Sequence, residues 1–140
     1  MHDLNKSDLE AVCKEIVNAL QERISWKWDS RFETALAEFG VDDKDRIHTI
    51  LERYLGSAWD SSNIGNAPDI VRMINSNLGG LMLGQLLLTS DPNQDAFIFC
   101  GWWPWGDGKT ISIRVAPYYK KLSDLEKAGK IQLFKVWFGL

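Results

Sequence analysis

Two cysteines, two histidines and one triplet typical of phosphate loops are the residues of this chain with the most obvious potential for chemistry. Gly108, Lys109 and Thr110 match the end of a phosphate-binding loop. That motif also needs a glycine at position 103, where the chain has tryptophan, and a helix after the lysine. The residues that follow Thr110 alternate as a strand does. The triplet therefore indicates a turn rather than a nucleotide site.

The histidines and cysteines lack the spacing of metal ligands: His2, His48, Cys13 and Cys100 lie far apart in the sequence. His48 precedes Glu52 by one helical turn, which favours a surface pair over a catalytic role. Cys100 falls on the core side of a predicted strand, where a thiol is poorly placed to act as a nucleophile. We therefore predict no catalytic residue, no metal site and no cofactor, although the many aspartates leave acid–base chemistry open.

Tryptophan is the residue type that most distinguishes this sequence. Three of the seven tryptophans stand at positions 102, 103 and 105, just before an Asp-Gly pair that favours a β-hairpin turn. If that pair forms the turn, Trp103 faces Ser112 and Cys100 faces Val115 across the hairpin. Strand alternation then places one set of side chains on each side of the sheet.

The two sides of this hairpin differ in character. One is wholly apolar and is expected to lie in the core: Ile98, Cys100, Trp102, Pro104, Ile111, Ile113 and Val115. The other mixes large rings with small polar groups and a cation: Phe97, Phe99, Gly101, Trp103, Trp105, Thr110, Ser112 and Arg114. Gly101 would leave a notch beside Trp103, and Arg114 lies diagonal to Trp103, within reach of a cation–π contact or an acidic partner.

The mixed side has two interpretations. Either helices and its own rings shield it, or it is a contact surface, because Trp and Arg are enriched at binding hot spots. On the second interpretation we expect a small, acidic, non-catalytic binding protein that acts through protein–protein contact, as immunity and accessory proteins do. The candidate contact residues are Trp103, Trp105, Arg114, Phe99 and Trp59.

An alternative function is a small-molecule-binding or enzymatic α+β domain. Its pocket would lie between the helices and the sheet and would be lined by Trp59, Phe97, Phe99, Trp103 and Trp105. Aromatic platforms of this kind suit sugars, flat aromatic compounds and organic cations.

Composition limits the partners. The 140 residues are 45% hydrophobic and 25% charged, as in an ordinary soluble protein, and the net charge is −3 without a basic run. Nucleic-acid binding is therefore not expected. No apolar run approaches the roughly 20 residues that span a bilayer, and the N-terminus lacks the apolar segment of a signal peptide. We expect a cytoplasmic protein with no membrane partner and with both cysteines as thiols.

The first half of the chain has the pattern of helices. Apolar residues spaced by three or four predict helices over residues 7–24, 30–39, 43–55 and 68–78. Ser7 and Ser30 begin Ser-x-x-Glu capping boxes at the first two of these. Residues 57–66 are rich in turn formers and predict a loop.

The second half has the pattern of strands, predicted over residues 81–89, 96–105, 110–117 and 130–138. A short helical turn capped by Ser123 is expected to end at Gly129. The run at 81–89 also permits a helix. The last strand is apolar on both parities, which predicts a bulge near 133–134 or burial on both faces. As an exposed edge it would pair with a second copy, so we expect a homodimer.

These patterns together predict a single α+β domain over residues 1–140. About four N-terminal helices, within residues 1–79, would pack on a C-terminal antiparallel sheet of three to four strands, within residues 81–140. The capping boxes and the Asp-Gly turn occur in many unrelated proteins, so they indicate no family.

Overall fold

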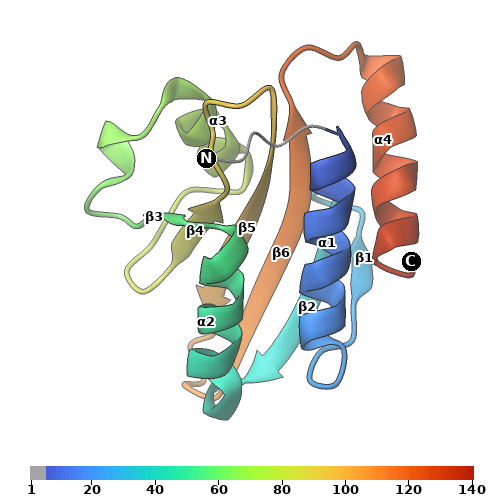
Figure 1. The fold of residues 1–140 in the computed structure, drawn as a ribbon. Helices are drawn as coiled ribbons and strands as arrows, with labels where there is room; N and C mark the ends of the chain where they lie inside the picture. The colour runs from blue at the N-terminus through green and yellow to red at the C-terminus, as the bar shows by residue number, and fades with distance from the viewer. Residues whose placement is uncertain (1–5) are drawn as a thin grey trace.

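The computed structural model describes residues 6–140 and contains an antiparallel sheet with helices on both faces (Figure 1). The α-helices in this range are α1 (Lys6–Leu20), α2 (Lys44–Tyr54), α3 (Asp69–Asn77) and α4 (Asp124–Trp137). The strands are β1 (Lys27–Asp29), β2 (Thr34–Gly40), β3 (Ser57–Trp59), β4 (Leu86–Thr89), β5 (Ala96–Pro104) and β6 (Thr110–Tyr119). Short 3-10 helices occur at Val41–Asp43 and Ile64–Asn66. None of the described helices is long and apolar enough to cross a membrane.

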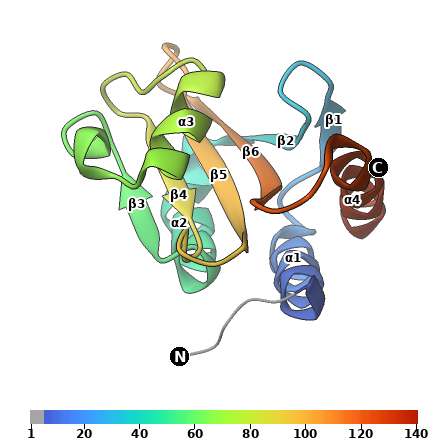
Figure 2. The same cartoon turned by 90° about the horizontal axis from the view of Figure 1, so that it is seen from above.

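The six strands lie in the order β1-β2-β6-β5-β4-β3, with every neighbouring pair antiparallel. Helices α1, α2 and α4 lie on one side of the sheet, and α3 lies on the other side, over β5 and β4 (Figure 2). The main core fills the space between the sheet and α1, α2 and α4. A smaller core lies beneath α3.

The predicted register of the tryptophan hairpin is confirmed. Trp103 pairs with Ser112 and Cys100 pairs with Val115 between β5 and β6. In the turn, one carboxylate oxygen of Asp107 accepts hydrogen bonds from the backbone N–H groups of residues 109 and 110 at 2.8 and 3.0 Å. Gly108 follows with φ +69°, a conformation that glycine adopts without strain. Local turn chemistry therefore sets the register.

The prediction of N-terminal helices packed on a C-terminal sheet of three to four strands is wrong. The sheet has six strands, three of them in the first half of the chain, and α4 is C-terminal. The predicted helix 30–39 is a loop followed by β2. Its residues Ala35, Ala37 and Phe39 alternate toward the main core, and β2 pairs with β1 on one side and β6 on the other. Because Leu36 is buried on the opposite face, apolar residues also recur at helical spacing.

The predicted last strand, 130–138, is wrong for the opposite reason. The capping box at Ser123 is confirmed, because its hydroxyl accepts from the N–H of Glu126, but the helix continues through residue 129 to form α4. Phe134 and Phe138 pack together with ring centroids 4.5 Å apart, and Phe134 also packs against Trp28 of β1. The apolar residues on the two strand parities are divided on the helix: Phe134 and Phe138 are buried, whereas Leu133 and Val136 are 47% and 70% exposed. The edge-strand argument for a homodimer no longer applies.

Two smaller differences from the prediction concern the strands β4 and β3. Only Leu86–Thr89 of the predicted strand 81–89 is extended, and Ser57–Trp59 of the predicted loop forms the edge strand β3. β3 pairs with β4 over three residues. The predicted cap of the first helix at Ser7 involves a side chain outside the described part of the chain.

Candidate contact surface

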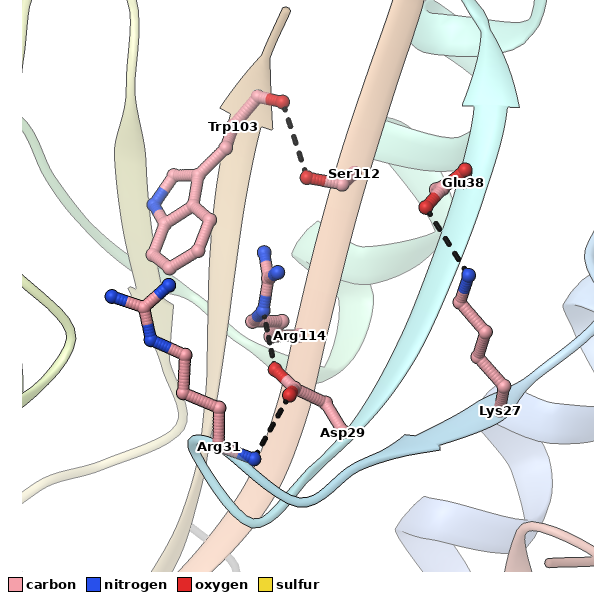
Figure 3. Close-up of polar contacts among 7 residues, drawn as sticks. All are labelled: Lys27, Asp29, Arg31, Glu38, Trp103, Ser112 and Arg114. Carbon is pink, nitrogen blue, oxygen red and sulfur yellow. Dashed lines mark hydrogen bonds and ion pairs between the residues drawn. The ribbon is translucent and has the colours of Figure 1, made fainter.

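The candidate surface lies on the α3 side of the sheet, where α3 leaves β1, β2 and part of β6 uncovered. We call it the Trp103 face (Figure 3). It consists of Lys27, Asp29, Arg31, Phe32, Glu38, Trp103, Ser112 and Arg114. Figure 3 draws all of these side chains except Phe32; those drawn stand in front of the strands, and the helices lie behind them. Lys27 and Glu38 pair at 3.4 Å at its margin.

Arg114 is the central cation of this face, and it is already paired. Its guanidinium carbon lies 4.4 Å from the centroid of the Trp103 ring, which confirms the predicted cation–π contact. Its Nε donates to Oδ2 of Asp29 at 2.8 Å, and the two side chains are only 18% and 13% exposed. The charge of Arg114 is therefore balanced by Asp29, so Arg114 is not available to an acidic partner.

The β1–β2 loop adds a second cation. Phe32 meets Trp103 edge to face, with centroids 6.0 Å apart, and the guanidinium carbon of Arg31 lies 4.9 Å from the Phe32 centroid. Asp29 also accepts a hydrogen bond from the backbone N–H of Arg31 at 3.1 Å. Arg31 is exposed, and no carboxylate within the described chain pairs with it. Arg31 is thus the cation that an external anion can reach.

Sequence reasoning missed Asp29, Arg31 and Phe32, because it placed residues 30–39 in a helix. The signal that could have found them is the alternation of Ala35, Ala37 and Phe39, which predicts a strand entered through a loop. The predicted notch at Gly101 is also filled. A Cβ at that glycine would lie 3.4 Å from the Trp103 indole, so the ring covers the glycine.

The other candidate residues lie around this pair rather than in it. Trp105 follows β5 and is 45% exposed, whereas Phe99 is 8% exposed and belongs to the core beneath α3. Trp59 lies on β3 in the same cross-strand row as Arg114, three strands or about 14 Å away. The structure therefore brings Trp103 and Arg114 together, places Trp105 just beyond the end of β5, and separates Trp59 from them.

The two cysteines and His48, considered above as reactive groups, are engaged in the packing of the protein. Both cysteines are buried free thiols. Burial, aided by the nearby Glu10, raises the pKa of Cys13 to about 12, and burial also raises the pKa of Cys100. Both thiols therefore stay protonated near neutral pH. His48 contacts Glu52 at 2.7 Å and packs edge-on against Trp102.

Metal ligation has no support in the described part of the chain. No group of three or more His, Cys, Asp or Glu side chains there could hold a metal ion, and His2 lies outside it. What the Trp103 face can offer is contact: an aromatic ring held in place by a paired arginine, and one accessible cation. Comparison of the chain with protein-family models, with curated proteins and with solved structures gives no significant match.

Proposed function

We propose that this protein is a small, non-catalytic, cytoplasmic binding protein that acts through contact of the Trp103 face with a protein partner. The supporting observation is the stack of Trp103 on Arg114, held by Asp29 and placed beside the accessible Arg31. Side chains already fixed before association lose little conformational entropy on binding. Trp and Arg are also the residue types that dominate interface hot spots.

The chemistry of this face defines the partner. Arg31 would pair with a carboxylate, while Trp103 and the exposed Trp105 would take apolar or aromatic side chains. A second copy of this chain is one candidate, since its net charge of −3 supplies surface carboxylates. A different acidic protein is the other. The two free cysteines support a reducing compartment, in keeping with a cytoplasmic location.

Light scattering after size exclusion, combined with affinity capture by the tagged protein, tests this proposal. The informative variant is Arg31→Glu with Trp105→Ala, because both side chains are exposed and neither supports the core. The matched control is Arg53→Glu, an arginine on α2 that is also exposed and has no ion pair in the described chain. We expect the double variant to stay folded by circular dichroism and to lose a self-association or a partner that the control keeps.

Retention of every association by the folded double variant would show that the Trp103 face is not the contact surface. If a dimer persisted, the outer side of α4 would be the next candidate interface, because Leu125 and Val136 are 86% and 70% exposed there.

The alternative small-molecule domain required a pocket lined by the rings of β3 and β5. Two of those rings, Phe97 and Phe99, are buried beneath α3 at 0% and 8% exposure. A cavity does exist on this side of the sheet, but most of its lining residues are different.

A further inference from the structure

A cavity of about 390 Å³ lies at the end of β2. It is bounded by the β1–β2 loop, the C-terminal half of α3, β6 and α4. Strand β6 continues to Tyr119, whereas its last pair with β2 joins Val115 to Ala35. The cavity therefore opens where β6 extends beyond the end of β2. Pro117 lines this stretch and has no N–H to leave unpaired.

The cavity has an apolar floor and a polar rim. Its floor is formed by Ile74, Leu78, Phe99, Ala116 and Phe134, all buried. Its rim carries the exposed residues Ser30, Arg31, Glu33 and Asn77. No hydrogen bond or ion pair joins these four side chains to the rest of the described chain. The volume falls within the range of small-molecule sites, about 300–1,000 Å³.

Glu33 draws particular attention to this rim. Its φ is +54°, and among the described residues it is the one non-glycine residue with a positive φ. A residue with a Cβ is strained in this conformation, which glycine adopts freely. Strain of this kind is found preferentially at functional sites. A glutamate where glycine would be more stable points to a use for the carboxylate.

The two charges of the rim belong together. Arg31 and Glu33 lie two residues apart on one loop, both line the cavity, and they do not pair with each other. A ligand with a single charge would pair with either Arg31 or Glu33 and leave the other side chain without a partner. A ligand with both charges and an apolar body would use the whole site.

We propose that this cavity binds an α-amino acid with a large apolar side chain. The ammonium group would pair with Glu33, the carboxylate with Arg31, and the side chain would lie on the floor among Phe99, Ala116 and Phe134. Charge-assisted hydrogen bonds at both ends of the ligand would give the selectivity. This inference does not rest on the proposed protein contact.

Titration of the ¹⁵N-labelled protein by NMR tests the proposal directly, with L-phenylalanine as the probe. We expect saturable shifts at the backbone amides of residues that line the cavity, among them Arg31, Glu33 and Asn77 on the rim and Ala116 and Phe134 on the floor. 3-Phenylpropanoate and phenethylamine, which each lack one charge, should bind at least about tenfold more weakly, the value of one charge-assisted hydrogen bond. L-Alanine, which lacks the apolar body, should be weaker still.

Variants of Glu33 separate binding from folding. Glu33→Gln should weaken L-phenylalanine about tenfold or more, while Glu15→Gln, a matched change on an exposed glutamate of α1, should not. Glu33→Gly should raise the melting temperature by relieving the strain and still lose binding. Arg31→Met should behave as Glu33→Gln does, with Arg53→Met as its control.

Four results would overturn the proposal. They are the absence of saturable shifts, shifts that map away from the cavity, a singly charged analogue or L-alanine that binds as tightly as L-phenylalanine, and unchanged affinity in Glu33→Gln. Arg31 enters both proposals, but Glu33 is tested only here and Trp105 only for protein contact. Unchanged affinity in Glu33→Gln therefore leaves the protein contact intact, and association retained by Arg31→Glu with Trp105→Ala leaves this site intact.

Discussion

The two faces of the six-stranded sheet are covered by different means. On one face, α1, α2 and α4 bury an almost purely apolar layer that includes Cys100, Trp102 and Ile113. On the other face, the nine-residue α3 covers β4 and β5, and the remaining area is covered by the sheet's own side chains. There, Trp103 lies over Gly101, and Arg114 is tied to Asp29.

Because of this difference, one face of the sheet contributes most to stability and the other carries the residues suited to recognition. Apolar burial contributes about 25 cal/mol per Å², so the face with three helices supplies most of the folding free energy. The ion pair and the stacked rings of the Trp103 face contribute less, because the desolvation of the charged groups offsets much of their attraction. That face can therefore carry exposed cations and rings without a large loss of stability.

The sharpest test of this comparison uses adjacent tryptophans that point to opposite faces. Trp102 is 6% exposed and contacts the rings of Phe39 and His48. Trp102→Ala should lower the free energy of unfolding by about 3–5 kcal/mol, because it leaves a large cavity in the main core. Trp103→Ala should cost about 1–2 kcal/mol, mostly through lost contacts with Arg114 and Phe32. Urea denaturation followed by circular dichroism measures both.

Equal losses in the two variants would contradict the division between the faces. Trp105→Ala provides the control, since its 45% exposed ring should change stability by less than about 0.5 kcal/mol.

The hairpin shows which features are predictable from sequence. Its register and the division of its side chains are local consequences of an Asp-Gly turn and a period of two. The neighbouring ion pair is not local, because Arg114 and Asp29 are 85 residues apart. No short-range pattern joins them, and the prediction of a helix over 30–39 removed β2, the strand between them.

The errors in β2 and α4 both arise where apolar residues lie on more than one side of an element. β2 is buried between two layers of the molecule, whereas α4 buries Phe134 and Phe138 and leaves Leu133 and Val136 exposed. With apolar residues on both sides, a segment satisfies the helical and the strand period alike. Tertiary packing then decides the element. Arg31 and Glu33 were missed for the same reason, since their loop exists only because β2 is a strand.

A second test raises the pH and acts on the face with three helices. Burial raises the pKa of Cys13 from its usual 9.0 to about 12 and raises that of Cys100, while burial and the nearby Cys13 raise the pKa of Tyr119 to about 12. The unfolded chain loses these protons from about pH 9, but the folded chain keeps them. The contribution of these three groups to stability should therefore be constant below about pH 9 and fall as the pH rises to about 12, by at most about 1.4 kcal/mol per pH unit for each group.

Thermal unfolding across this pH range, compared with that of Cys13→Ala, measures the effect. The variant should lose less stability per pH unit than the parent. An identical slope would show that Cys13 is not held protonated by the fold.

The smallest expected effect concerns the Trp103 face itself, and a double-mutant cycle measures it. Arg114→Met leaves Asp29 without its partner, and Asp29→Asn leaves Arg114 without its counter-charge, so each single variant should lose about 1–3 kcal/mol. The double variant should lose less than the sum, with a coupling energy of about 1–2 kcal/mol, because the pair is mostly shielded from water.

The exposed pair of Lys14 and Glu10 on α1 is the matched control, with an expected coupling of about 0.3–0.5 kcal/mol. A coupling in the Arg114–Asp29 cycle no larger than this would mean that water screens the ion pair. The stack of Trp103 on Arg114 would then be loosely held, and the argument for a pre-formed contact surface would lose its basis. A coupling near 2 kcal/mol would instead show that this face is fixed before any partner arrives.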